Sequence, residues 1–176
     1  GVAPGGSVLA SLLRVGGDLP ALWHDPRLRP IGECWACAVE IAAGPGQGFR
    51  TRPACHEALL DGCEIRSRGE ALDEFRRSLL ERLAVHVDAS ELERFPDKAL
   101  HRAMHSHGIA AAMPAASPGA IDASHPYIRV DMSRCIACQR CVRICDEVQG
   151  ESVWHVFGRG ADLRIGVADG VTLAES

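Results

Sequence analysis

The chain opens with a short helical pattern followed by a strand pattern. Within residues 7–17, apolar side chains recur at the spacing of one helix face, and Ser7 is placed to cap the helix. Residues 36–55, ACAVEIAAGPGQGFRTRPAC, hold two β-prone runs around a Gly/Pro turn. We therefore expect residues 1–66 to form a small, loop-rich domain of β type.

The next region is helical in pattern. Ser67 and Glu70 have the spacing of a capping box, which predicts a helix that begins between them. Its apolar positions recur at helical spacing: Leu72, Phe75, Leu79 and Leu83. A second helix is expected from about residue 96 to Gly108, and residues 109–124 are rich in Ala, Pro, Ser and Gly. Residues 67–124 are thus predicted to be a helical connector and a linker.

The last region, residues 125–176, returns to strand-like patterns. Residues 127–132, YIRVDM, alternate as a strand does, and residues 152–167 predict a hairpin around Gly158–Gly160. The order of these regions predicts an α+β fold.

Composition excludes some functions. A net charge of −4 argues against general nucleic-acid binding, and no apolar stretch is long enough to cross a membrane. The chain has eight cysteines, and several of them are separated from the next by only two residues. Such grouping favours metal ligation in a reducing compartment over loop-closing disulfides, which are the alternative. We therefore expect a cytoplasmic protein. Because the chain starts with Gly rather than Met, we expect it to be processed or trimmed.

One cysteine run carries the strongest chemical signal. Its four cysteines follow the pattern C-x2-C-x2-C-x3-C: Cys135, Cys138, Cys141 and Cys145. This spacing is typical of [4Fe–4S] ligation, although the fourth cysteine of such runs usually serves a second cluster. Zinc is the alternative metal. The chain has no second run, so it stops short of one, another subunit supplies it, or the cluster is incomplete.

Three arginines lie in or beside the run: Arg134, Arg140 and Arg143. Cations there would stabilise the reduced cluster and raise its potential. The alternative is that each is an ordinary solvated charge.

With these residues in view, the chain resembles a known group of proteins. Residues 125–150 resemble the ferredoxin-like segment of NAD-dependent formate dehydrogenase alpha subunits. The same segment occurs in the diaphorase small subunit of NAD-reducing hydrogenases and in the large iron–sulfur subunit of respiratory NADH dehydrogenase. Residues 19–41 and 52–55 resemble the β-grasp, plant-ferredoxin-like [2Fe–2S] domain that opens those chains. Residues 94–109 resemble the connecting segment of some formate dehydrogenases.

The resemblance implies a β-grasp domain, a helical connector and a bacterial-ferredoxin-like domain. It also implies a second cubane run shortly after residue 176, so we expect the chain to be truncated before that motif. The implied partners are a flavin/NAD-binding subunit and a pterin catalytic domain or subunit, which would follow in whole family members.

The resemblance implies four [2Fe–2S] ligands, but this chain matches three: Cys34, Cys37 and Cys55. The first ligand should lie eleven residues before Cys34, where the chain has Trp23. An indole nitrogen is only a donor, so Trp23 cannot replace a thiolate. The balance is therefore against a [2Fe–2S] cluster in a degenerate first domain.

Three side chains could replace the missing thiolate: Cys63, His24 and His56. Histidine serves in this way in Rieske centres, and a zinc ion on Cys34, Cys37, Cys55 and Cys63 is a further alternative. Many relatives also hold a cubane on one histidine and three cysteines after the first helix. This chain has His86 there but no cysteine between residues 64 and 134. His101 and His105 share a helix face, which we interpret as solvated.

We expect an electron-transfer module without a catalytic residue of its own. Its cubane would pass single electrons between a pterin site and a flavin/NAD partner. The alternatives are a structural or assembly domain with degenerate cluster sites, and a stand-alone ferredoxin-like subunit. Formate as the substrate is implied by the resemblance alone.

Overall fold

The structure is a computed structural model that describes residues 6–112, 121–168 and 171–176. It divides into two compact units. Unit 1 comprises Gly1–His24, Pro30–Arg82 and Phe95–Ala110, and unit 2 comprises Asp25–Arg29, Leu83–Arg94 and Ala111–Ser176. The domain boundaries expected at residues 66 and 124 stay a prediction.

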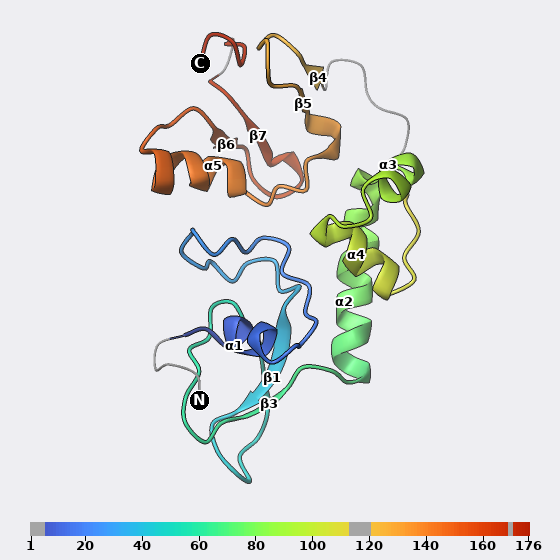
Figure 1. The fold of residues 1–176 in the computed structure, drawn as a ribbon, viewed down its shortest axis with the longest axis vertical. Helices are drawn as coiled ribbons and strands as arrows, with labels where there is room; N and C mark the ends of the chain where they lie inside the picture. Colours follow the sequence, from blue (N-terminus) through green and yellow to red (C-terminus); the bar gives the residue numbers. More distant parts are fainter. Residues whose placement is uncertain (1–5, 113–120, 169–170) are drawn as a thin grey trace. The chain divides into compact units, whose positions relative to one another are not determined.

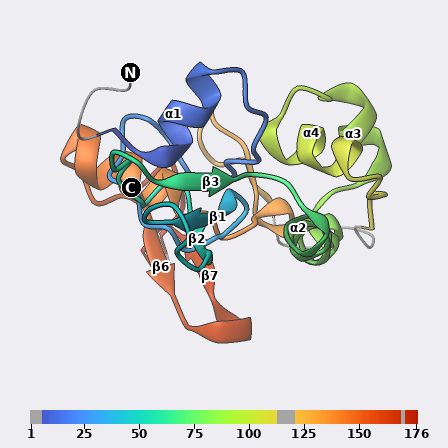
Figure 2. The same cartoon turned by 90° about the horizontal axis from the view of Figure 1, so that it is seen from below.

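Unit 1 is built on a small antiparallel sheet. Its strands are β1 (Ala38–Ala42), β2 (Arg50–Pro53) and β3 (Glu64–Arg66), in the order β2-β1-β3. Helix α1 (Val8–Arg14) lies against this sheet (Figures 1 and 2). The expected helix and strand pair are therefore confirmed. The third strand is short and lies outside the sequence prediction.

The core of unit 1 forms between α1 and the sheet. Ser7 caps the helix, with the Ala10 N–H donating to its Oγ at 3.2 Å. Val8 and Leu9 are fully buried and share one cluster with Val39 and two cysteines, Cys37 and Cys55. Two predicted ligands are thus part of the apolar core.

Helix α2 (Glu70–Leu83) differs from its prediction in two ways. It begins at Glu70, because Gly69 has a non-helical φ of +149° and its carbonyl accepts from the Asp73 N–H, so the Ser67–Glu70 capping box does not form. Its buried side chains are Leu72, Arg76 and Leu80, whereas Phe75 is 44% exposed. The buried face is rotated because the Arg76 guanidinium reaches backbone carbonyls inside the unit.

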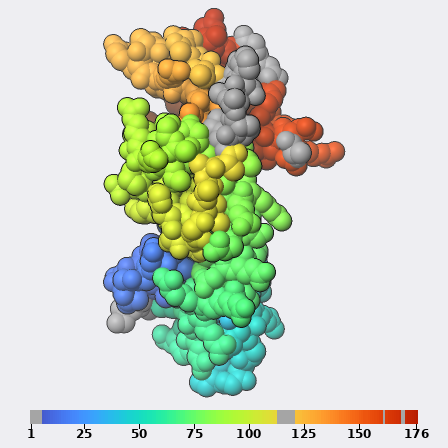
Figure 3. All heavy atoms as spheres, turned by 90° about the vertical axis from the view of Figure 1, so that its right-hand side faces the viewer, coloured from blue at the N-terminus to red at the C-terminus, as the bar shows by residue number. Residues whose placement is uncertain are grey.

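The second expected helix is α4 (Ala99–Ser106), which ends before Gly108 with its φ of +64°. Figure 3 shows its side chains, in yellow, beside those of α2, in green. The expectation that His101 is solvated is wrong: it is 4% exposed and its Nδ1 lies 2.7 Å from the Phe95 carbonyl oxygen. His105 is exposed.

Unit 2 contains two short strand pairs and the cysteine run. The elements, in chain order, are a 3-10 turn at Ala84–His86, α3 (Ala89–Arg94), β4 (Ile121–Asp122), β5 (Val130–Asp131), a 3-10 turn at Met132–Arg134, α5 (Arg140–Ile144), a π-helical turn at Cys145–Gln149, β6 (His155–Phe157), a 3-10 turn at Gly160–Asp162 and β7 (Arg164–Gly166). Figure 1 shows the last hairpin beside α5.

The sequence predictions for this unit hold in part. The hairpin is confirmed, with Val156 opposite Ile165. The strand expected over residues 127–132 shrinks to β5, which pairs with β4. Residues 113–120 of the expected linker lie outside the described residues. Across the described ranges, no helix is long and apolar enough to cross a membrane.

Candidate iron–sulfur sites

The cysteine run begins on a loop and continues into a helix. Cys135 and Cys138 lie on the loop that leads into α5, Cys141 lies in α5, and Cys145 begins the π-helical turn. Asp131 orders the start of the loop, because the Ser133 N–H donates to the Asp131 carboxylate at 3.1 Å. Ala137 and Gln139 then adopt left-handed φ values of +53° and +55°. Such alternation turns backbone N–H groups toward one side and makes a concavity that favours anions, including iron–sulfur clusters. The Ala137 N–H donates to the Cys135 Sγ at 3.4 Å.

The four cysteines of this run lie near the surface. Cys135, Cys138 and Cys145 are half-buried, and Cys141 is exposed. Burial raises the pKa of Cys135 and Cys141, and hydrogen bonds from the backbone of Ala137 and Val142 offset part of that rise. The loop therefore offers sulfur ligands, N–H donors and partial exclusion of water, which together fit a cubane.

Two of the three arginines in or beside the run, Arg134 and Arg143, form ion pairs. Arg134 contacts three carboxylates, at 2.6 Å from Asp88, 3.4 Å from Glu91 and 3.0 Å from Asp131. Arg143 lies 3.0 Å from Glu147. Each of these two charges is thus balanced locally, and the expected effect of the arginines on the cluster potential stays a prediction.

Three of the other four cysteines, Cys34, Cys37 and Cys55, lie at one end of the unit 1 sheet. Cys37 directly precedes β1 and Cys55 follows β2, and the Cys55 N–H donates to the Cys37 Sγ at 3.4 Å. The hydrogen bond that the Cys37 thiol donates to Cys55 raises the pKa of Cys37 and lowers that of Cys55. Burial raises the pKa of Cys34, against backbone hydrogen bonds from Ala36 and Trp23.

Trp23 adjoins Cys34, as the resemblance implies for the first ligand. Its backbone N–H donates to the Cys34 sulfur, and its indole Nε1 is buried without a hydrogen-bond partner among the described residues. A [2Fe–2S] cluster needs two ligands on each iron. The described residues offer three thiolates and an indole here, so they do not complete that set.

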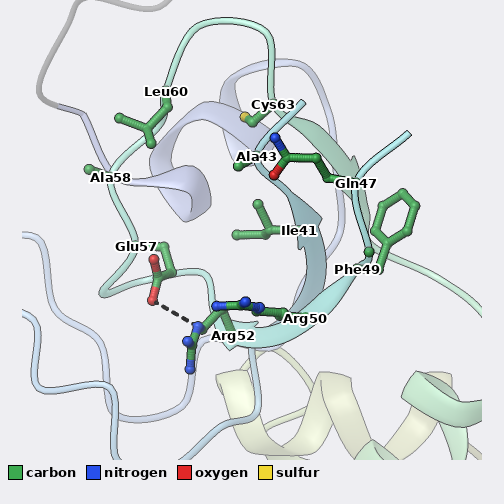
Figure 4. Close-up of a pocket in the computed structure, with 11 residues that line it drawn as sticks. Ile41, Ala43, Gln47, Phe49, Arg50, Arg52, Glu57, Ala58, Leu60 and Cys63 are labelled. Atoms are coloured by element: carbon green, nitrogen blue, oxygen red, sulfur yellow. Dashed lines mark ion pairs between the residues drawn. The ribbon is translucent and has the colours of Figure 1, made fainter. Parts of the chain in front are cut away.

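The structure does not bring Cys63 to the other three cysteines. Cys63 precedes Glu64, which pairs with Ala42 at the far end of β1 from Cys37. At about 3.3 Å per residue, the length of β1 separates Cys63 from Cys37 by roughly 15–20 Å. Cys63 instead lines an open groove of about 410 Å³ beside Ile41 and Leu60 (Figure 4). His24 is half-buried and His56 is exposed.

All the strained non-glycine backbone of the described residues lies in the two cysteine loops. Three non-glycine residues there have positive φ: Trp35, Ala137 and Gln139. Each lies between two cysteines that are separated by two residues, and left-handed backbone is costly for non-glycine residues. No pattern in the sequence indicates these conformations. Clustered strain of this kind is typical of a functional site.

One histidine, His86, contacts the backbone next to the cysteine run. His86 Nδ1 lies 3.3 Å from the backbone oxygen of Ser133, two residues before Cys135. Of the side chains in the described ranges, no three from His, Cys, Asp and Glu come close enough to share a single metal ion.

Two family models match the chain. Residues 125–176 match the ferredoxin-like domain of NADH-quinone oxidoreductase subunit 3. Residues 1–70 match a 2Fe-2S iron-sulfur cluster binding domain. These matches support iron–sulfur clusters as the cofactors of the chain, and they coincide with the two cysteine regions.

Whole proteins are similar as well. The chain is 30% identical over 172 residues to a subunit of an NADH-quinone oxidoreductase of Rhizobium meliloti (strain 1021), covering 93% of this chain and 20% of that protein. It is 28% identical over 173 residues to the alpha subunit of an NADPH-Fe(3+) oxidoreductase of Geobacter sulfurreducens (strain ATCC 51573 / DSM 12127 / PCA), covering 96% and 20%. The chain thus spans about a fifth of these relatives.

A solved structure agrees over the full chain. A chain in the crystal structure of an NAD+-reducing [NiFe]-hydrogenase in the H2-reduced state is 30% identical, with a TM-score of 0.82. The match covers 100% of this chain and 74% of that one. The chain therefore belongs to the family of NADH-quinone oxidoreductase and NAD+-reducing hydrogenase iron–sulfur subunits, in which it forms an iron–sulfur electron-transfer module.

Proposed function

We propose that the chain relays single electrons between a flavin/NAD-binding partner subunit and a separate catalytic site, in a reducing compartment such as the cytoplasm. The observation that carries this proposal is the loop over residues 135–139. It holds two left-handed residues, Ala137 and Gln139, and the Ala137 N–H donates to the sulfur of the half-buried Cys135. A bound iron–sulfur cluster supplies reversible one-electron chemistry. The chain supplies thiolate ligands, backbone N–H donors, and arginines whose charges are balanced by neighbouring carboxylates.

The proposed ligands of the cubane are Cys135, Cys138, Cys141 and Cys145. In two-cluster ferredoxins the last cysteine of such a run serves the other cluster. We propose that a second cubane run follows in the whole protein and supplies the exchanged ligand. The corresponding domains are a β-grasp domain over residues 1–66, a connector over 67–124 and a ferredoxin-like domain over 125–176.

The identity of the catalytic partner is the finer part of the proposal. The resemblance of residues 94–109 to formate dehydrogenase connectors favours a pterin site that oxidises formate. The similarity to a hydrogenase structure favours the alternative, a site that splits H2. Assay of the whole complex for NAD+ reduction by formate and by H2 separates them. Activity with formate supports the pterin partner, and activity with H2 alone excludes it.

A second function, assembly, is favoured for the first domain. Trp23 takes the place of a thiolate: its backbone adjoins Cys34, and its indole Nε1 is buried. Unit 1 can then serve as a packed docking domain that carries no electron itself.

A redox titration tests the relay function. Anaerobically purified chain is titrated electrochemically while the iron–sulfur absorbance is followed. One reversible one-electron wave per chain supports the proposal. If the chain takes up no iron during anaerobic reconstitution with iron and sulfide, and shows no such wave, only the assembly function remains.

A further inference from the structure

The helical segment that holds the last two cysteines of the run, Cys141 and Cys145, carries an ion pair that is nearly buried. Arg143 lies in α5 and Glu147 in the π-helical turn that follows it. The Arg143 Nε donates to the Glu147 Oε1 at 3.0 Å, and the two side chains are 11% and 16% exposed. A pair removed from water in this way is stable only if further hydrogen bonds satisfy its remaining atoms.

Those further bonds go to the backbone of a single residue far away in the sequence. The Arg29 N–H donates to the Glu147 Oε2 at 3.0 Å, and the Arg143 Nη2 donates to the Arg29 carbonyl oxygen. The backbone N–H and carbonyl of Arg29 are therefore both hydrogen-bonded, as they would be by a neighbouring β-strand. The Arg29 side chain itself is 87% exposed and its Nε lies 3.7 Å from Glu147.

The bound residue ends a short preformed turn. Within Asp25–Arg29, the Arg27 N–H and guanidinium both bind the Asp25 carboxylate, and the Leu28 N–H donates to the Asp25 carbonyl at 3.0 Å. Leu28 is 6% exposed, and the whole segment is part of unit 2. Because these bonds already order the turn, holding it in place at residue 29 costs little further conformational entropy.

We propose that Arg143 and Glu147 form a backbone clamp that holds the segment Asp25–Arg29 on the helix of the cubane run. Both are positioning residues. Glu147 balances the Arg143 charge two residues from Cys141 and Cys145, and the clamped segment limits solvent access to that helix. Loss of the clamp leaves a free cation and more water there, and both stabilise a more negative, reduced cluster. This second consequence rests on the proposed electron-transfer function.

Limited trypsin digestion tests the clamp without any need for a cluster. Glu147→Ala removes both acceptor atoms, and we expect cleavage after Arg27 to become about tenfold faster, since hydrogen bonds to charged groups are among the stronger ones. Arg29→Ala is the matched control, because it keeps the bound N–H and carbonyl, and it should be cleaved at the wild-type rate. Glu147→Gln, which keeps the shape of the side chain, should be intermediate.

Equal cleavage rates in Glu147→Ala and the wild type would overturn the clamp. So would an Arg29→Ala variant cleaved as fast as Glu147→Ala, because the side chain of residue 29 would then be what holds the segment. If Glu147→Ala does not fold, the ordering of wild type and Glu147→Gln decides the question in the same way.

A redox titration of the iron-loaded chain tests the positioning role. We expect Glu147→Gln to shift the midpoint potential to a more positive value and Arg29→Ala to leave it unchanged. An unchanged potential in Glu147→Gln would overturn the positioning role. A chain that binds no cluster but shows the expected cleavage pattern would refute the proposed function and leave the clamp standing.

Discussion

At the scale of single residues, the most informative position is 23. The Trp23 backbone N–H donates to the Cys34 sulfur, so the side chain of residue 23 starts next to Cys34. Position 23 is thus where a fourth thiolate would complete the ligand set. The indole Nε1, buried without a partner among the described residues, has no ligand chemistry to offer.

Trp23→Cys should therefore create a complete [2Fe–2S] site. We expect iron to rise from about four to about six atoms per chain, with a new [2Fe–2S] signal by EPR after reduction. Trp23→Phe is the control and should add no iron. If the wild type already holds six irons, or if Trp23→Cys adds none, then residue 23 is not the missing ligand position.

A second prediction concerns Ala137, whose φ is +53°. A β-branched side chain is strained further in left-handed backbone, whereas glycine adopts it freely. Ala137→Val should lose iron to a chelator at least tenfold faster than the wild type, which corresponds to about 1–2 kcal/mol. Ala137→Gly should retain iron as well as the wild type does. Equal loss from both variants would mean that this conformation does not support the site.

The residue scale also shows what sequence could and could not predict. Cysteine spacing identified both candidate regions, because ligand number and spacing are fixed by cluster geometry. It did not place Cys63, since the distance to Cys37 depends on the pairing of β3 with β1. The left-handed Trp35, Ala137 and Gln139 could not be foreseen, because tertiary structure imposes conformations that their local preferences oppose.

At the scale of elements, Arg76 joins α2 to the sheet. Its Nη2 donates to the carbonyl oxygens of Ala38 and Ser67, and its Nη1 lies 3.1 Å from Asp73. The side chain is 3% exposed, so both carbonyls lose their donor if it is removed.

Arg76→Leu should lower the free energy of unfolding by about 2–4 kcal/mol, because buried acceptors are left unpaired. Arg77→Leu, one position along the same helix and exposed, should change it by less than about 0.5 kcal/mol. Urea unfolding followed by circular dichroism measures both. Similar values for the two variants would contradict the role of Arg76.

A second element contact links α3 to the cysteine run through Asp88 and Arg134. A hydrogen bond from the Ser90 hydroxyl, a backbone bond from Glu91 and the Arg134 charge lower the Asp88 pKa. A carboxyl with a lowered folded pKa contributes stability above its unfolded pKa of about 3.9 and loses it as the pH falls through the folded value.

Asp88→Asn should therefore be less stable than the wild type at pH 7, and this difference should shrink as the pH falls below about 4. Thermal unfolding between pH 7 and pH 2 measures it, with the exposed Asp97→Asn as the control. A difference that stays constant over this range would show that the Asp88 charge is not what holds the contact.

Elements with a clear local pattern or turn signal were predictable, and short strands without one were not. The helix capped by Ser7, the strands β1 and β2 and the hairpin β6–β7 follow from local pattern and turn chemistry. Strands β3 and β4 have three and two residues, so they exist only through their partners. The buried face of α2 was not predictable because a charged residue, Arg76, lies on it.

At the scale of the whole molecule, the two cysteine regions are unequal. The family models match both regions, yet unit 1 brings only three of its four cysteines together, while the run in unit 2 has four. We therefore expect electron transfer by this chain to depend on the cubane run. The chain spans 20% of the length of two curated relatives.

The most direct test of the central claim is iron and acid-labile sulfide per chain, with EPR, on anaerobically purified and dithionite-reduced protein. We predict about four irons and four sulfides with a cubane-type signal, both lost in Cys138→Ser. Neither iron nor sulfide in protein that was never exposed to oxygen would contradict the account of an electron-transfer module.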